Sequence, residues 1–264
     1  MKQRRAGLKP RRQSRTLRIV ESWRPGRRRI AGTRAVERAL ERGERLHLIV
    51  LEEGAEAAAR TLSGPAREAG VPVQSVGARH FERLLPEGEP GGAVALAGEG
   101  PATDPAEVLR RAGPAWLLSG VVYPGNAGFA IRTAEVSGAA GVFLDTAFDH
   151  TKRREALRAS MRADRFLPVL WRDSGEVLDA ARAAGRRAIG IEDVGEQAPW
   201  ELDLTGPALF VVGGEAEGIS PASLERCDAV VRIPMSGFIR SYNLQAAVAV
   251  IAAERMRQEH GNRS

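Results

Sequence analysis

The sequence predicts an α/β protein whose larger sheet is mostly parallel. Short apolar runs rich in Val, Ile, Leu and Ala alternate with longer segments whose apolar residues recur at helical spacing. Strands that are connected through helices run in the same direction within one sheet. A stretch containing Gly, Pro, Thr and Asp at residues 98–105 interrupts this alternation and is predicted to be a linker between two domains.

Basic residues are concentrated at the N-terminus. Residues 1–29 contain twelve Lys/Arg and one acidic residue, Glu21, a net charge of +11, whereas the other 235 residues contain 27 basic and 32 acidic residues, a net charge of −5. We interpret residues 1–29 as a basic disordered arm that contacts the phosphates of a polyanion without reading its sequence. A solubilising tail is the alternative that the composition leaves open.

What the sequence lacks excludes several classes of protein. The single cysteine, Cys227, excludes an internal disulfide and a cysteine-rich metal site, and the four His are too scattered to suggest a metal site. No apolar run approaches the roughly 18 residues of a membrane span, and the N-terminus lacks the apolar core of a signal peptide. Neither a P-loop motif nor a dinucleotide fingerprint occurs. We expect a cytoplasmic protein that binds neither metal nor membrane.

Residues 30–97 are predicted to form a small α/β domain. A first helix is indicated by apolar residues at helical spacing between Ala35 and Leu40, with Gly43 as its C-cap. The elements expected after it are a strand at 47–51, a helix at 55–69, a strand at 71–76, a helix at 78–84 and a strand at 92–97. A unit of about 65 residues is small but able to fold.

Residues 106–264 are predicted to form the larger domain. The elements expected in order are a helix at 105–112, a strand at 115–121, a turn at 124–126 that leads into a helix, a strand at 141–144, a helix at 151–165, a strand at 167–171, a helix at 175–184, strands at 188–191, 209–212 and 230–233, and a long helix from about 243. In the helix after the turn, Ile131, Ala134 and Val136 are expected to pack on the sheet.

In the helix at 151–165, three arginines at i, i+4 and i+8 form a basic stripe, which either faces solvent or contacts phosphate: Arg154, Arg158 and Arg162.

Two glycine-containing loops near the C-terminus are the best candidates for a binding site. The run at 209–212 leads into the loop Gly213–Gly218, and the run at 230–233 ends at Pro234. Open α/β sheets bind ligands beyond the carboxyl ends of their strands. The first loop carries two carboxylates and no Lys, so it is a poor phosphate site but suits a neutral or cationic ligand such as a sulfonium nucleoside.

Three segments together resemble motifs 1, 2 and 3 of the SpoU/TrmH family of SPOUT RNA methyltransferases. They are Asn126-x-Gly-x-x-x-Arg132, Gly213-Gly-Glu-Ala-Glu-Gly218 and Ile233-Pro-Met-x-Gly-x-x-x-Ser-Tyr-Asn243, and their order and separation match the family. Residues 30–97 resemble the substrate-binding domain, similar to ribosomal protein L30e, that many members carry in front. The resemblance covers the chain except for residues 1–29.

The resemblance implies an RNA 2′-O-ribose methyltransferase that uses S-adenosylmethionine and works as a homodimer. It also implies a trefoil knot in the C-terminal SPOUT domain, a rare exception to the rule that chains do not thread loops. The implied RNA is rRNA or, second, tRNA. The implied catalytic residues are Arg132, Asn126, Glu215, Ser241 and Asn243. The implied cofactor-binding residues are Gly213, Gly214, Glu215, Gly218, Ile233, Met235, Tyr242 and Leu244, and RNA contacts are expected from Arg132, Arg154, Arg158 and Arg162.

The chemistry of methyl transfer to a hydroxyl suits these residue types. Arginine stays protonated at any ordinary pH, so we expect Arg132 to hold the 2′-hydroxyl and the adjacent phosphate and to stabilise developing negative charge. The proton acceptor stays open between a substrate phosphate, water and His150. The chain departs from the family pattern at Tyr123, at Arg162, where relatives have Gly, and at Tyr242, where many have Leu.

Two other functions compete with this interpretation. One is a non-catalytic RNA-binding protein built on the same scaffold, which the presence of all five implied catalytic residues argues against. The other is an α/β enzyme that acts on a small nucleotide, which leaves the basic arm unexplained.

Overall fold

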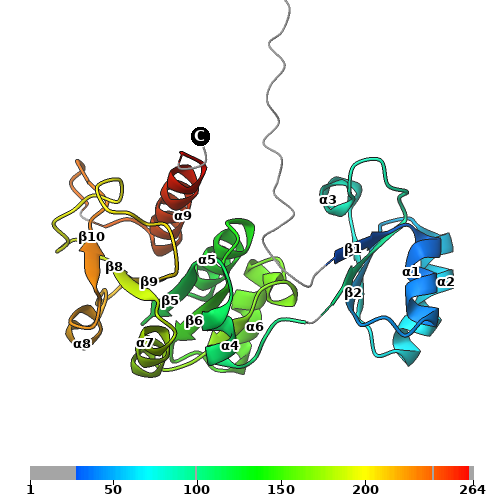
Figure 1. Cartoon of the computed structure of the whole chain (residues 1–264), viewed down its shortest axis with the longest axis horizontal. Helices are drawn as coiled ribbons and strands as arrows, with labels where there is room; N and C mark the ends of the chain where they lie inside the picture. The colour runs from blue at the N-terminus through cyan, green and yellow to red at the C-terminus, as the bar shows by residue number, and fades with distance from the viewer. Residues whose placement is uncertain (1–27, 99, 240, 262–264) are drawn as a thin grey trace, which may run out of the picture.

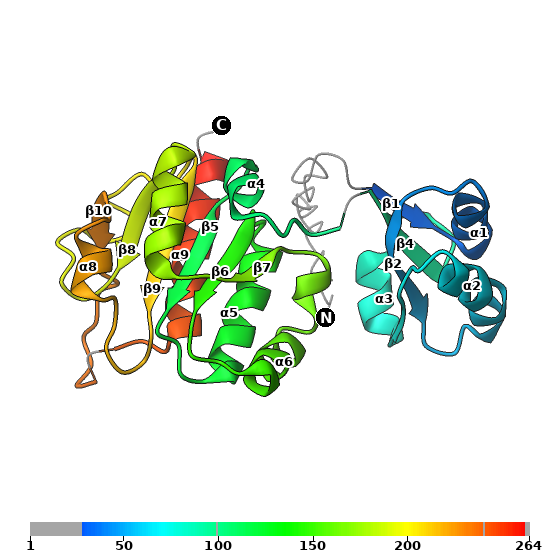
Figure 2. The same ribbon diagram turned by 90° about the horizontal axis from the view of Figure 1, so that it is seen from below.

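The computed structural model describes residues 28–98, 100–239 and 241–261. In these residues the chain forms two sheets, one of four strands in the order β1-β4-β2-β3 and one of six strands in the order β10-β8-β9-β5-β6-β7. The two sheets belong to two separate units, which the linker region joins (Figures 1 and 2). The α/β prediction is confirmed.

The N-terminal unit has a mixed sheet with helices on both faces. Its elements are β1 (Arg28–Ala31), α1 (Thr33–Glu41), β2 (Leu46–Glu52), α2 (Glu56–Glu68), β3 (Val73–Val76), α3 (Ala78–Leu84) and β4 (Ala93–Ala97). Strand β4 pairs antiparallel with β1 and β2, whereas β2 and β3 run parallel. Buried Val36 and Leu62 pack α1 and α2 on one face, and buried Phe81 packs α3 on the other.

Strand β1 begins inside the segment that the sequence predicts as a disordered arm. Arg28 pairs with Glu44, and Arg29 donates to the Leu84 carbonyl oxygen at 3.0 Å. Only the last two residues of this strand are buried. Its two exposed arginines resemble the basic residues before them, so the sequence pattern does not reveal a strand here. The arm boundary at residue 29 was therefore wrong by two residues, and residues 1–27 lie outside the described residues.

The larger unit has a fully parallel sheet. Its elements are α4 (Pro105–Arg110), β5 (Ala115–Ser119), α5 (Pro124–Val136), β6 (Gly141–Asp145), α6 (His150–Ala159), the 3-10 helix η2 (Ala163–Arg165), β7 (Val169–Trp171), α7 (Ser174–Ala183), β8 (Arg187–Ile191), β9 (Ala208–Gly213), α8 (Pro221–Leu224), β10 (Ala229–Val231) and α9 (Leu244–Gly261). All five strand pairs are parallel, as the alternation of strands and helices predicted. Helices α5, α6 and α9 cover one face of the sheet, and α4, α7 and α8 cover the other (Figure 2).

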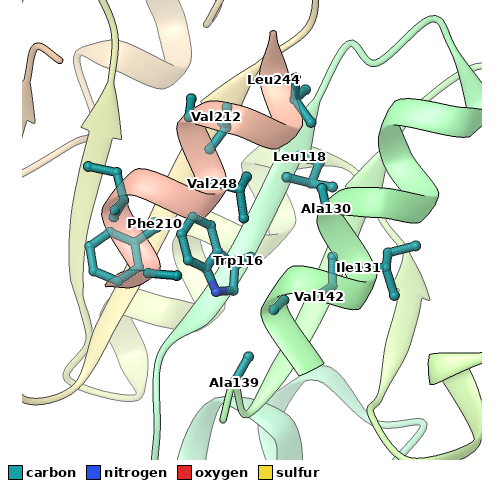
Figure 3. Close-up of a cluster of buried hydrophobic side chains, with 14 of the residues drawn as sticks. Trp116, Leu118, Ala130, Ile131, Ala139, Val142, Phe210, Val212, Leu244 and Val248 are labelled. Carbon is teal, nitrogen blue, oxygen red and sulfur yellow. The ribbon is translucent and has the colours of Figure 1, made fainter. Parts of the chain in front are cut away.

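The core under α5 and α9 is centred on Trp116 of β5. This side chain is fully buried, and its ring centroid lies 4.9 Å from that of Phe210 on the neighbouring strand β9. Ile131 of α5 and Val248 of α9 pack against the same cluster (Figure 3). Because a buried aromatic removes 150–250 Å² of surface from water, this cluster fixes both helices over the sheet. Helix α5 carries motif 1, and motif 3 ends at Asn243, directly before α9.

Two details of α5 differ from the sequence prediction. The helix begins at Pro124, so the residues predicted as a turn form its first helical turn, where the missing N–H of proline costs nothing. Val136 was expected to pack on the sheet, but its side chain is 70% exposed. It lies seven residues after the exposed Phe129, on the outer face of the helix.

Helix α6 ends earlier than predicted. The predicted helix ran to residue 165, but α6 ends at Ala159, and Met161 and Arg162 adopt the left-handed conformation with φ of 57° and 59°. Arg162 therefore leaves the stripe, which was wrong for this residue, and its Nη2 donates to Asp164 Oδ2 at 3.0 Å. Glycine adopts this conformation without strain, which explains the glycine of the family pattern at this position.

Helices α5 and α6 touch main chain to main chain at Gly128, the glycine of motif 1. A Cβ atom at this position would collide with the carbonyl oxygen of Ala156 and would lie 2.5 Å from the Cβ of Ala159. Both neighbours belong to a helix and cannot move independently. The glycine in the Asn-x-Gly motif is therefore required by helix packing, whatever its neighbours do in chemistry.

We predict that Gly128→Ala lowers the free energy of unfolding by about 1–3 kcal/mol or more, the usual cost of overpacking a tight interface. The measurement is urea denaturation of both proteins. Gly125→Ala is the matched control, because nothing lies within 4 Å of a Cβ atom there. For Gly125→Ala we expect a free energy of unfolding that is unchanged or higher by up to about 1 kcal/mol. Equal stability of the two variants would contradict this account of Gly128.

Candidate functional site

A cavity of about 420 Å³ lies where β8, β9 and β10 end and α9 begins. Its apolar wall consists of Ile191, Val212, Ile233, Leu244 and Ala247. All eight residues that the sequence predicts to bind a cofactor line this cavity: Gly213, Gly214, Glu215, Gly218, Ile233, Met235, Tyr242 and Leu244. The structure thus brings together two loops that are about twenty residues apart in sequence.

The loop after β9 owes its shape to glycine. A Cβ atom on Gly213 would collide with the main chain of Gly218, and one on Gly214 would collide with the carbonyl oxygen of Gly120. The Gly218 N–H donates to the Gly214 carbonyl oxygen at 3.2 Å, which closes the loop on itself. Main-chain groups of the glycines therefore form part of the cavity surface, beside Glu215 and Glu217.

Three residues from the three motifs form one hydrogen-bond network. The Asn126 amide donates to Glu215 Oε1 at 2.6 Å, and its own oxygen accepts from Asn243 Nδ2 at 3.2 Å. The second oxygen of Glu215 accepts from the Val122 N–H at 3.0 Å. Asn243 is oriented by Gln245, whose N–H donates to its Oδ1 at 3.0 Å. The side-chain amides of Asn126 and Asn243 therefore each have one defined orientation.

Ser241 and Arg132 occupy different places around this network. Ser241 lines the cavity, whereas Asn126 and Arg132 do not. Arg132 lies on the exposed face of α5, and its side chain forms no hydrogen bond or ion pair with any other residue that the structure describes. Its unpaired guanidinium, on the same helix as Asn126, is available to an anionic ligand.

The three arginines of the predicted basic stripe lie apart from the cavity. Arg154 and Arg158 are exposed on α6. Arg162 is half-buried and paired with Asp164, and burial raises the pKa of that carboxyl group while Arg162 opposes the shift. Two of the three arginines are thus free to contact phosphate, and the third helps to hold the turn after α6.

Sequence reasoning missed several residues of the cavity. Glu192 and Asp193 follow strand β8, and Glu217 and Arg232 lie beside residues that were predicted. The rule that ligands bind beyond the carboxyl ends of parallel strands could have identified Glu192 and Asp193, because both follow a predicted strand directly. No sequence signal would have found the Tyr242 hydroxyl, which donates to the Pro234 carbonyl oxygen at 3.2 Å and ties the two ends of the loop 234–242 together.

The lining fits an adenosine group that carries a positive charge. The apolar wall suits a purine ring, and the main chain of the glycine loop offers donors and acceptors without side chains in the way. Four carboxylates line the cavity, against one guanidinium, that of Arg232: Glu192, Asp193, Glu215 and Glu217. Among the described residues no group of His, Cys, Asp and Glu could hold a metal ion, and no helix there is long and apolar enough to cross a membrane.

Two families match this chain. Residues 115–253 match the SpoU rRNA Methylase family, and residues 29–99 match the domain described as RNA 2′-O ribose methyltransferase substrate binding. The first match covers the parallel sheet and all three motifs. The second covers the N-terminal unit.

Proteins of known name and known structure agree with these matches. The 23S rRNA (guanosine-2′-O-)-methyltransferase RlmB of Pseudomonas putida is 29% identical over 244 residues, 89% of this chain and 98% of the relative. That of Pseudomonas syringae is 31% identical over 161 residues, 60% of this chain and 64% of the relative. The crystal structure of the SpoU methyltransferase AviRb from Streptomyces viridochromogenes superposes with a TM-score of 0.60, at 29% identity, over 90% of this chain and 91% of that one. Its complex with the cofactor AdoMet gives 0.58, at 27% identity, over 89% and 92%.

The fold and the glycine-lined cavity are those of RNA ribose methyltransferases that use S-adenosylmethionine. The chain belongs to the SpoU rRNA methylase family.

We predict that Tyr242→Leu leaves the affinity for S-adenosylmethionine within about tenfold of the unaltered protein. The side chain is 46% exposed, and Pro234 is exposed as well, so water can replace the lost hydroxyl bond. A hydrogen bond of this kind contributes about 0.5–1.5 kcal/mol. Calorimetric titration measures the change, and Tyr242→Phe separates the hydroxyl from the ring. A hundredfold loss in a folded Tyr242→Leu protein would contradict this prediction.

Proposed function

We propose that the protein methylates the 2′-hydroxyl of a ribose in rRNA, with S-adenosylmethionine as the methyl donor. The observation that carries the proposal is the network of Asn126, Glu215 and Asn243 beside the glycine-lined cavity. Ribosomal RNA is favoured over tRNA because the RlmB relatives from P. putida and P. syringae are named as 23S rRNA methyltransferases. The same names support a site of action in the cytoplasm.

Each group of the site has a distinct task in this proposal. When bound, S-adenosylmethionine supplies a methyl group on a positively charged sulfur. The main chain at Gly213–Gly218, at Ile233 and at Tyr242 holds the adenosine part, and Ser241 faces the cavity beside it. Positioning of the two reactants supplies much of the rate in such a transfer. The hydrogen bonds among Asn126, Glu215 and Asn243 hold the three motifs in fixed positions relative to one another, which this positioning requires.

Arg132 binds the acceptor and stabilises its developing negative charge. Its guanidinium is exposed and has no ionic partner among the described residues, so a phosphate or a ribose oxygen can take that place. Glu215 already accepts two hydrogen bonds, which assigns it to positioning rather than to proton removal. His150 does not line the cavity and its ring nitrogen lies 3.3 Å from Thr151 Oγ1. We therefore assign the proton to a substrate phosphate or to water.

The rest of the chain provides RNA binding. We assign residues 28–97 to substrate binding and residues 106–264 to catalysis. The ten basic residues of positions 1–27, together with exposed Arg154 and Arg158, supply positive charge for phosphate contacts. The arm from residue 1 to 27 is part of this proposal through its charge alone.

We predict that the protein transfers methyl groups from S-adenosylmethionine to ribosomal RNA and that Arg132→Ala lowers turnover on the order of a hundredfold or more, the scale for removing one oxyanion-type donor. The measurement is transfer of radiolabelled methyl groups, followed by mapping of the ribose that resists alkaline cleavage.

Calorimetry serves as the control for Arg132→Ala, because cofactor affinity should not change when a residue outside the cavity is replaced. Near-normal turnover in the variant would refute the role of Arg132. Binding of S-adenosylmethionine and RNA without methylation of any rRNA fragment would favour the non-catalytic RNA-binding protein.

We also propose that two copies of the chain form a homodimer through the outer faces of α5 and α9. These helices lie side by side over one face of the sheet (Figure 1). Phe129 and Val136 of α5 are 47% and 70% exposed, and Val250 of α9 is 36% exposed between exposed Ala249 and Ala253. An apolar surface of this kind on two adjacent helices indicates a protein interface, and it places the exposed Arg132 beside the partner.

We predict that Phe129→Asp converts a dimer into a monomer, since a charge would be buried without a partner. Size-exclusion chromatography with light scattering measures the mass. Val194→Asp, at a 66% exposed loop residue of the same unit, is the control and should not change it. An unaltered protein that is monomeric at micromolar concentration would refute the dimer.

A further inference from the structure

The cavity carries more negative charge than its neighbours neutralise. Four carboxylates and one guanidinium line it, a formal charge of −3. No ion pair joins Glu192, Asp193, Glu215 or Glu217 to any residue in the part of the chain that the structure describes. Unpaired carboxylates around a cavity favour a cationic ligand over a neutral one.

Glu192 differs from the other three carboxylates in its surroundings. It is half-buried, whereas Asp193, Glu215 and Glu217 are exposed. Its Oε2 accepts from the Ile219 N–H at 2.8 Å, and its Oε1 accepts from the Asp193 N–H at 3.2 Å. A Cβ atom on Gly218 would lie 2.6 Å from Oε2, so the glycine loop packs directly against the carboxylate. The carboxylate is thus held in one place at the cavity wall.

We propose that Glu192 makes the cavity prefer S-adenosylmethionine over the product S-adenosylhomocysteine by their charge. This inference rests on the proposed function. The two ligands differ by one methyl group and by one positive charge, which S-adenosylmethionine carries on its sulfur. A fixed carboxylate at the wall attracts that charge and has no such attraction to the neutral thioether of the product. Glu192 is therefore a residue that promotes exchange of product for fresh methyl donor.

Glu192 contributes more to this charge preference than the other carboxylates because it is half-buried. Water and salt screen exposed charges strongly, and buried or half-buried charges much less. Asp193, Glu215 and Glu217 are all exposed to solvent. At the effective dielectric constant of about 20 that fits groups near a protein surface, one fixed charge changes the affinity for a monovalent cation by about tenfold at a separation of about 12 Å, and by more at shorter separations.

The test is calorimetric titration of the full chain and of Glu192→Gln with three ligands. S-adenosylmethionine has a positive sulfur, sinefungin has an ammonium group in its place, and S-adenosylhomocysteine is neutral there. Glutamine keeps the shape, and its amide oxygen can still accept from the Ile219 N–H, so the substitution removes the charge together with the bond from the exposed Asp193 N–H. We expect the affinities for the two cationic ligands to fall about tenfold and that for S-adenosylhomocysteine to change less than about twofold.

Glu196→Gln is the matched control, because Glu196 is exposed on the same loop and does not line the cavity. It should leave all three affinities unchanged. The unaltered protein offers a second measurement, since added NaCl should weaken binding of S-adenosylmethionine more than binding of S-adenosylhomocysteine.

Two outcomes overturn the inference. An equal loss for all three ligands in Glu192→Gln would place Glu192 against a group that they share, and unchanged affinities together with equal salt dependence would remove its role altogether. Failure of the unaltered protein to bind any of the three would instead refute the proposed function.

Discussion

The site depends on the approach of main chain to main chain at a few glycines. Gly213 contacts the main chain of Gly218, and Gly214 contacts that of Gly120. Side chains would separate these segments by several Å, and the loops that follow β5 and β9 could not lie against each other. At Gly128 the same constraint holds α5 against α6. The positions of motifs 1 and 2 are therefore set mainly by close contacts of glycine with main-chain atoms.

The hydrogen-bond network can exist because these contacts bring the motifs together. Asn126 lies in the first turn of a helix that Trp116 and Ile131 fix on the sheet, and Asn243 is held by Gln245 at the start of α9. Glu215 reaches both the Val122 N–H and the Asn126 amide from the glycine loop. Each amide has its donor and acceptor ends fixed, so replacement of either asparagine by a carboxylate would place two acceptors in contact. The residue types of the motifs follow from this geometry as much as from chemistry.

A buried arginine stabilises the larger unit at the end of the sheet that lies opposite to the cavity. Arg186 is 4% exposed and donates to the carbonyl oxygens of Leu109, Gly113, Arg111 and Ala208. Burial lowers the pKa of its guanidinium to about 10, which still leaves it charged at neutral pH. It satisfies carbonyl groups at the end of α4 that no helical N–H can reach. It thereby closes the N-terminal ends of β8 and β9, opposite to the ends at which the cavity lies.

The sequence by itself determined the fold class, most of the element boundaries and, through the three motifs, part of the cavity lining. Alternating apolar runs predict a parallel sheet because buried strands need apolar residues on both faces, and the three motifs identify their loops through residue types that chemistry and tight turns both require. Local pattern could not reveal β1, whose two exposed arginines look like part of a basic arm, or the end of α6, where Met161 and Arg162 adopt a left-handed conformation that only surrounding contacts can hold. The tertiary structure alone decided that Glu192 borders the cavity, that Tyr242 closes its loop on Pro234, and that Val136 faces outward. Each of these depends on which distant segment lies opposite, and that is set by packing rather than by spacing along the chain.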